Sequence, residues 1–250
     1  MVRGQLGREL TRAVPVSLFA PRSPLHKLLV GYKAAPSERA RQEWQAWLSK
    51  LLEKFFRLHL SCLVGPALGQ VPHRPESPQL LAVPVPSSSE PRASWDGEHP
   101  LVGLLTAALA AEPRLVLAPQ LVKGAQTVGH LRANLSGFRV VGPVRGRQVL
   151  VLDDTYTSGA RSQSAAASLA GAGAEVIAIV PIGRLVHPDH NRSTRELWAQ
   201  QGRQRFDLGR CACPCLDGHA RSVRGQLETA STRPGTPQTR AASAPSGSRP

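Results

Sequence analysis

The sequence predicts an α/β domain in which a mostly parallel β-sheet is flanked by helices. Short apolar runs typical of buried strands alternate with longer segments whose apolar residues recur at helical spacing. This alternation extends over most of the 250 residues, a length sufficient for one sizeable domain. Strands that alternate with helices are usually parallel neighbours, with helices on both faces of the sheet.

Five apolar runs are the candidate strands, and the central ones contain almost no polar residues. Such a composition is typical of parallel strands that are buried on both faces. The runs cover residues 14–20, 79–86, 115–118, 149–152 and 175–182.

The longest candidate helix begins after Pro36, with Ser37 as its N-cap. Its apolar residues recur every three or four positions, which predicts one buried face. We therefore interpret Trp44 and Trp47, which lie in this stripe, as core residues. Further helices are expected over residues 25–33, 100–111, 125–133, 162–170 and 193–201, and a loop is expected over residues 65–78.

The two ends of the chain differ from its middle. Residues 1–13 are a basic lead expected to be flexible, and residues 217–250 have the Ser-, Pro- and Arg-rich composition typical of disorder. The domain is therefore expected over residues 14–216. The longest apolar run, residues 101–111, is too short to cross a bilayer, and no secretory signal is evident. The expectation is a cytoplasmic protein without membrane contact.

The chain is strongly basic, with a formal net charge of +14. This charge favours anionic ligands, either phosphates or nucleic acid. Aromatic residues make up only 4% of the chain, and no dense basic cluster is interleaved with them. Specific nucleic-acid binding is therefore not favoured by composition.

Three cysteines near the C-terminus, Cys211, Cys213 and Cys215, invite a zinc interpretation. Their C-x-C-x-C spacing lacks the two-residue gap that lets two thiolates share one tetrahedral ion comfortably. A partly buried cluster that binds no metal is the preferred interpretation, and zinc is the alternative.

The most informative segment is VLVLDDTYTSGA at residues 149–160. An apolar strand ends at two adjacent carboxylates, and a Thr/Ser/Gly turn then opens a helix. Carboxylates can accept hydrogen bonds from ribose hydroxyls, whereas the turn offers N–H groups, hydroxyls and a helix N-terminus to a phosphate. The alternative is a chance strand followed by an acidic helix cap. The full combination favours a site for a phosphorylated sugar at the carboxyl end of the sheet, where such sheets bind ligands.

Residues 151–160 resemble the phosphoribosyl pyrophosphate (PRPP) motif of type I phosphoribosyltransferases. QTVGHLRANLSGF at residues 126–138 resembles the segment that precedes this motif in competence protein F-like (ComF-like) proteins. The resemblance covers residues 14–216 and is closest to ComF-like and amidophosphoribosyltransferase-like proteins. It implies a type I phosphoribosyltransferase fold with a small hood. It also implies a glycosyltransferase of nucleotide metabolism, which transfers the phosphoribosyl group of PRPP to a nitrogen acceptor and releases pyrophosphate.

The resemblance also implies roles for individual residues. Asp153 and Asp154, as the catalytic pair, would hold the ribose hydroxyls directly or through Mg²⁺. Gly159 would let the phosphate approach the backbone closely, because a Cβ there would intrude. The 5′-phosphate would be bound by Thr155, Thr157, Ser158, Gly159 and Ala160, and the pyrophosphate side would involve Ser87, Ser88, Ser89, Lys123 and Arg132.

Two departures from the family pattern leave turnover open. Arg161 stands in place of the motif's last threonine, either as a charged donor or pointing to solvent. The Arg-Gly-Phe-Asn block found near the pyrophosphate loop of many ComF-like proteins is replaced by ASWDGEHP at residues 93–100. The alternative is a non-catalytic protein that binds PRPP or a nucleotide monophosphate. It would act in regulation or as a ComF-like accessory of DNA uptake, the only case with a nucleic-acid partner. The sequence identifies no acceptor, and a homodimer is left open.

Overall fold

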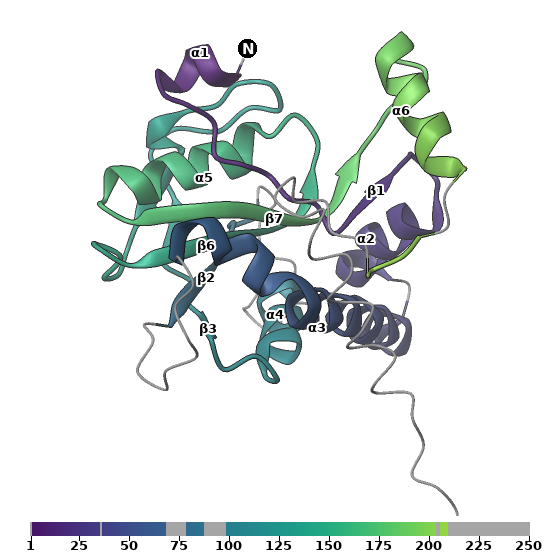
Figure 1. Ribbon diagram of the computed structural model, residues 1–250, viewed down its shortest axis with the longest axis horizontal. Coiled ribbons are helices and arrows are strands. Elements are labelled where there is room, and N and C mark those ends of the chain that lie inside the picture. Colours follow the sequence, from purple (N-terminus) through teal and green to yellow (C-terminus); the bar gives the residue numbers. More distant parts are fainter. Residues whose placement is uncertain (1, 36, 69–78, 88–98, 204–205, 210–250) are drawn as a thin grey trace, which may run out of the picture.

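Figure 1 shows the computed structural model, which describes residues 2–35, 37–68, 79–87, 99–203 and 206–209. A five-stranded sheet lies at its centre, and all neighbouring strands in it are parallel. The α/β class with a parallel sheet is confirmed, and the arrangement is compatible with a Rossmann-like fold. In spatial order the strands are β1 (Ser17–Phe19), β7 (Glu175–Leu185), β6 (Gln148–Tyr156), β2 (Leu80–Pro84) and β3 (Leu115–Leu117).

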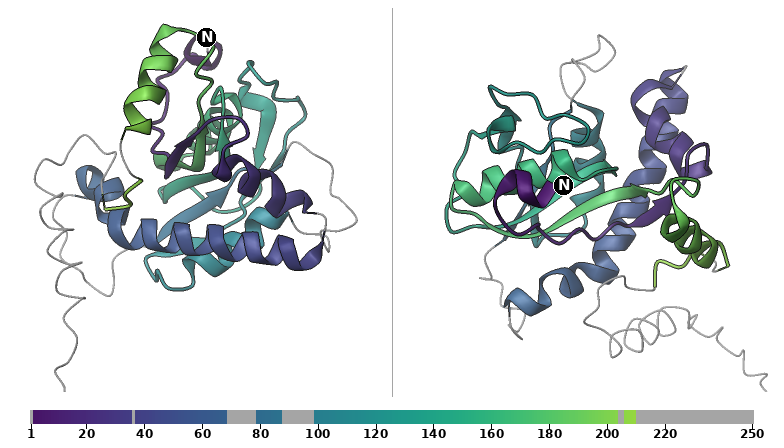
Figure 2. Two further views of the ribbon diagram at one scale, coloured as in Figure 1. Left: turned by 90° about the vertical axis from the view of Figure 1, so that its right-hand side faces the viewer. Right: turned by 90° about the horizontal axis from the view of Figure 1, so that it is seen from above.

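Helices cover both faces of this sheet (Figures 1 and 2). Leu150 and Leu152 face a core shared with the helices of one layer, whereas Val149 and Val151 face a second core on the opposite side. Because both faces are buried, the central strands contain continuous apolar runs. One layer contains α2 (Pro24–Ala34), α3 (Glu38–Leu68) and α4 (Pro100–Leu109), and the other contains α1 (Val2–Leu6) and α5 (Ala160–Gly171).

The remaining elements lie outside these layers. The helix α6 (Arg192–Gly202) follows β7 and has no buried residue. A second, two-stranded antiparallel sheet is formed by β4 (Leu121–Lys123) and β5 (Phe138–Val140), with the 3₁₀ helix η2 (Leu135–Gly137) before β5. Among the described helices, none is both long and apolar enough to cross a bilayer.

The helix predicted over residues 125–133 is wrong. The segment is an irregular loop between β4 and β5. Asn134 explains much of this, because its side chain accepts from the Ser136 N–H at 2.9 Å and donates to Gln126 Oε1 at 2.6 Å. Local side-chain bonds of this kind compete with a helical hydrogen-bond ladder.

Two boundaries and the burial of one tryptophan also differ from the prediction. The lead expected to be flexible contains the helix α1, whose Leu6 is only 4% exposed. The helix α3 continues to Leu68, through the first part of the expected loop. Trp47 is 69% exposed and is therefore not a core residue, whereas Trp44 packs against the core. Trp47 lies at the edge of the apolar stripe, where helical spacing alone cannot separate buried from exposed positions.

Gly31 marks the close approach of α2 to α3. A Cβ at this position would lie 1.4 Å from Cζ3 of Trp44, whereas a Cβ at Gly103 in α4 would meet no atom within 4 Å. We expect Gly31→Ala to lower the free energy of unfolding by about 1–2 kcal/mol through overpacking. Gly103→Ala, the matched control, should raise it by about 0.5–1 kcal/mol through helix propensity. Urea unfolding of both variants checks this, and equal stabilisation by the two substitutions would contradict the packing.

Candidate functional site

The topology places a switch point between β2 and β6. From β2 the chain continues through α4 to β3 on one side, whereas from β6 it continues through α5 to β7 on the other. The helices α4 and α5 also cover opposite faces of the sheet. Open parallel sheets bind ligands beyond the carboxyl ends of the strands at such a point. Pro86 and Ser87 follow β2 there, and the acidic pair lies on β6.

The acidic pair was predicted to lie where the strand ends. In the structure it lies within the strand β6. The pairing of β6 with β2 ends at Leu152, opposite Pro84, while its pairing with β7 continues to Tyr156. The strand is therefore longer than its apolar run, because β7 also continues past the end of β2. Asp153 and Asp154 consequently lie on β6, just beyond the point where the neighbouring strand β2 ends. The predicted phosphate turn follows them along the chain.

The predicted phosphate turn joins β6 to α5. Thr157 is exposed, Thr155 and Ser158 are half-buried, and Gly159 and Ala160 are buried. The Ser158 hydroxyl accepts from the Ala160 N–H at 3.2 Å and donates to the His130 carbonyl of the β4–β5 loop. The turn thus opens a 12-residue helix, whose first N–H groups have no intrahelical acceptor.

Gly159 is required by the shape of this turn. It is the N-cap of α5 and has a φ of +80°, in the left-handed region that favours glycine. A Cβ there would lie 2.2 Å from the Tyr156 hydroxyl oxygen. Gln163 in α5 donates to this hydroxyl at 3.4 Å and also bonds the Thr11 backbone. The side chain that a Cβ at Gly159 would meet is therefore that of Tyr156, which is packed against the same turn.

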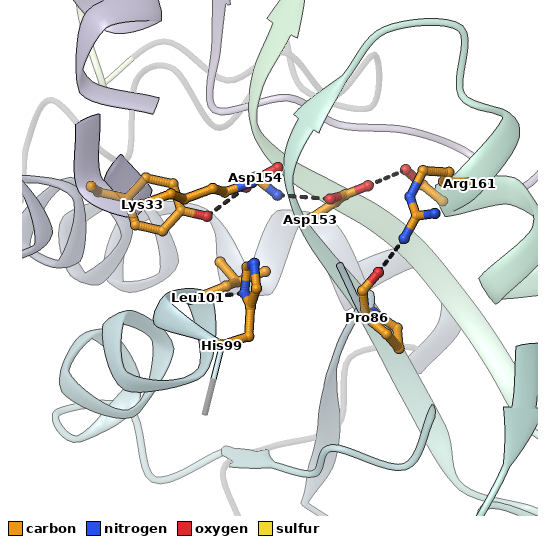
Figure 3. Close-up of polar contacts among 9 residues, drawn as sticks. Lys33, Pro86, His99, Leu101, Asp153, Asp154 and Arg161 are labelled. Carbon is orange, nitrogen blue, oxygen red and sulfur yellow. Dashed lines mark hydrogen bonds and ion pairs between the residues drawn. The ribbon is translucent and has the colours of Figure 1, made fainter. Parts of the chain in front are cut away.

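The acidic pair is held by donors from three elements (Figure 3). Asp153 Oδ2 accepts from the Ser162 hydroxyl of α5 at 2.5 Å, and its Oδ1 accepts from the Asp154 N–H at 2.9 Å. Asp154 Oδ2 accepts from the Tyr32 hydroxyl at 2.5 Å and forms an ion pair with Lys33. Tyr32 and Lys33 belong to the last turns of α2, which thereby reaches the centre of the site.

The two carboxylates differ in their proton affinity. Burial, together with the charge of Asp154, raises the pKa of Asp153 to about 7. Burial also acts to raise the pKa of Asp154, but the charge and hydrogen bond of Lys33 act in the opposite direction together with the hydrogen bond from Tyr32, and this pKa is lowered. Asp154 is therefore the ionised member of the pair near neutral pH, and Asp153 is the member that takes up a proton.

Arg161 connects the phosphate turn to the segment that follows β2. Its guanidinium donates to the Pro86 carbonyl (Figure 3). It also lies 5.5 Å from the centroid of the Phe138 ring. Burial lowers its pKa, while the charges of Asp153 and Asp154 act in the opposite direction. Arg161 does not point freely to solvent, and it places a positive charge beside the acidic pair.

The pyrophosphate side is only partly described. Ser87 is half-buried next to Pro86, whereas Ser88 and Ser89 lie outside the described residues. Lys123 is exposed at the end of β4, and Arg132 is exposed in the β4–β5 loop. This loop is anchored on α5, where the Ser164 hydroxyl accepts from the Asn134 N–H at 2.9 Å and the Ser168 hydroxyl donates to the Leu135 carbonyl at 3.0 Å.

The sequence offers two metal candidates, Mg²⁺ at the acidic pair and, as the less favoured alternative, zinc at the C-terminal cysteines. Cys211, Cys213 and Cys215 lie outside the described residues. Within the described ranges, no group of three or more His, Cys, Asp or Glu residues is placed to hold a metal ion. The ammonium of Lys33 lies against Asp154 Oδ2, where a cation bound directly by this carboxylate would lie, so the arrangement does not fit a resident Mg²⁺.

His99 is a site residue that the sequence analysis did not identify. Its Nδ1 accepts from the Leu101 N–H at 3.1 Å, so that His99 caps α4 directly beside the acidic pair (Figure 3). Burial and the charge of Lys33 lower its pKa to about 4. The imidazole is therefore neutral near pH 7, and its ring is oriented by the cap.

This lowered pKa predicts a pH effect on stability. Between pH 6.5 and 4 the unfolded chain binds a proton at His99 that the folded chain resists, so acidification destabilises the fold through this residue. His99→Asn keeps a good N-cap but removes the titration. We expect the melting temperature of the wild type to fall relative to that of His99→Asn as pH decreases from 6.5 to 4. A constant difference across this range would contradict a neutral, buried His99.

Tyr32, Lys33 and Ser162 also reach the site without having been predicted. The Tyr32–Asp154 contact spans 122 residues, and no local pattern around Tyr32 indicates a ligand site. Of these three residues, only Ser162 could have been identified from the sequence, because it lies in the first turn of the helix that follows the motif.

Comparison with known proteins gives no family assignment. No protein-family model matches the chain, and no curated protein matches it in a sequence search.

Proposed function

We propose that this protein is a type I phosphoribosyltransferase that binds PRPP at the β6–α5 turn. It would transfer the phosphoribosyl group to a nitrogen acceptor, release pyrophosphate and act in the cytoplasm. The observation that carries the proposal is a juxtaposition at the switch point. Asp153 and Asp154 directly precede the turn of residues 155–160, in which Gly159 is the N-cap of α5. A ribose 5-phosphate needs both features, acceptors for its hydroxyls and an N–H-rich turn for its phosphate.

The chemistry assigned to these residues is mainly electrostatic. The turn at Thr155–Ala160 binds the 5′-phosphate, and the acidic pair accepts hydrogen bonds from the 2′- and 3′-hydroxyls. The bond from C1 to the pyrophosphate oxygen breaks, and its electron pair leaves with pyrophosphate. A new bond forms between C1 and the acceptor nitrogen, which loses its proton to solvent. The carboxylate of Asp154 stabilises the positive charge that develops on the sugar ring.

A second candidate is a protein that binds PRPP or a nucleotide monophosphate without turning it over. One contact favours it. The guanidinium of Arg161 is engaged by the Pro86 carbonyl. A cation that is bound internally is less available to stabilise a leaving pyrophosphate. Regulation or an accessory role in DNA uptake would suit such a protein.

One experiment separates these candidates. The wild type is incubated with PRPP and a panel of purine bases, pyrimidine bases and amines, and pyrophosphate release is followed together with calorimetric binding. Release with at least one acceptor, abolished in Asp153→Asn/Asp154→Asn, is the expected result for the transferase. Binding without release across the panel supports the second candidate, and absence of binding contradicts both.

A further inference from the structure

The ion pair between α2 and β6 places a cation of the chain itself at the acidic pair. Lys33 lies in the last turn of α2, and its ammonium contacts Asp154 Oδ2, which also accepts from the Tyr32 hydroxyl. Tyr32 is completely buried, and it fixes the end of α2 against β6. The packing of α2 against β6 therefore fixes the position of the Lys33 backbone beside the acidic pair.

The acidic pair already faces positive charge from the chain itself. The ammonium of Lys33 forms an ion pair with Asp154. Arg161 adds a second positive charge that acts on both carboxylates. A divalent cation in contact with this pair would have to displace the Lys33 ammonium and compete with Arg161.

Lys33 also has access to a ligand. Its side chain is 28% exposed, whereas that of Asp154 is 10% exposed. The ammonium thus lies at the boundary between the buried carboxylate and solvent. A phosphate or pyrophosphate oxygen that approaches the acidic pair from solvent meets this ammonium, which is a strong point-charge partner for phosphates.

We propose that the ammonium of Lys33 takes the place of a divalent cation at the acidic pair, so that PRPP binds here without Mg²⁺. The proposal rests on the phosphoribosyl site proposed above and specifies its charge requirement. It replaces the Mg²⁺ expected from the family resemblance with a residue of the chain. Lys33 would neutralise Asp154 in the free protein and would contact the anionic ligand when PRPP is bound.

Calorimetric titration of the wild type with PRPP, in buffer containing either MgCl₂ or EDTA, tests this directly. We expect the two dissociation constants to agree within about threefold, less than 1 kcal/mol. Binding that requires MgCl₂ overturns the Lys33 proposal and leaves the phosphoribosyl site standing. Absence of PRPP binding in both buffers overturns the Lys33 proposal and the proposed function together.

A lysine variant provides the second arm. Lys33→Gln should weaken PRPP binding in EDTA by about tenfold or more, and MgCl₂ should restore part of the affinity. Lys27→Gln, which removes an exposed charge from the same helix, should bind like the wild type in both buffers. Equal binding by Lys33→Gln and Lys27→Gln in EDTA would contradict the proposal. Circular dichroism confirms that each variant is folded.

Discussion

Gly159→Ala should abolish measurable PRPP binding and lower the free energy of unfolding by about 2–3 kcal/mol. Two costs add at this position. An alanine at a φ of +80° is strained by about 1–2 kcal/mol. Its Cβ would also lie 2.2 Å from the Tyr156 hydroxyl oxygen, so the turn or the tyrosine must move. Either movement displaces the N–H groups proposed to bind the 5′-phosphate.

Gly146→Ala is the matched control for this prediction. Gly146 also has a positive φ, +69°, but a Cβ there would meet no atom within 4 Å. It should therefore show only the strain cost, about 1 kcal/mol, with unchanged PRPP affinity. Urea unfolding and calorimetry measure the two effects separately. Identical behaviour of the two variants would show that the contact with Tyr156 does not shape the site.

Asp153→Asn/Asp154→Asn should weaken PRPP binding by about 100-fold, because replacing a hydrogen bond to a charged group with a neutral one loses about 1–1.5 kcal/mol at each of the two residues. The substitution removes the negative charge proposed to face the sugar while preserving side-chain volume. Asparagine also keeps an oxygen acceptor for the Tyr32 and Ser162 hydroxyls, so the local packing is largely maintained.

The control for charge is Glu38→Gln/Glu43→Gln. It removes two carboxylates from exposed positions in the first two turns of α3. PRPP affinity in this variant should match that of the wild type, since screened surface charges have little effect at a distance. A comparable loss in both double variants would mean that overall charge, and not the acidic pair, governs binding.

The layered α/β fold was predictable because its determinants are local. The run from Val149 to Leu152 is apolar on both faces, and this alone indicates a central parallel strand. The turn after the acidic pair was identifiable for the same reason, since Thr157, Ser158 and Gly159 are consecutive. Their spatial proximity follows from the chain itself.

The partners of the acidic pair could not be predicted, because they depend on tertiary packing. Lys33 and Tyr32 reach Asp154 only because α2 packs beside the end of β6. The helix predicted at residues 125–133 failed for a related reason. Helical propensity there is opposed by the side chain of Asn134, whose bonds to Gln126 and Ser136 depend on the folded loop.

Two residues on which the resemblance rests make structural contacts in this protein. Asn134 shapes the β4–β5 loop, and Phe138 is buried beneath the Arg161 guanidinium. His99, which lies in the segment 93–100, caps α4 beside the acidic pair. One departure from the resemblance, at residues 93–100, concerns the proposed pyrophosphate side, whereas the other, Arg161, directly follows the proposed phosphate turn.

The most direct test of a phosphoribosyl site at the β6–α5 turn is a calorimetric titration of the wild-type protein with PRPP. Saturable binding to a single site, weakened about 100-fold in Asp153→Asn/Asp154→Asn and retained in Glu38→Gln/Glu43→Gln, is the predicted result. No heat of binding with the folded wild type, or unchanged affinity in Asp153→Asn/Asp154→Asn, would contradict it.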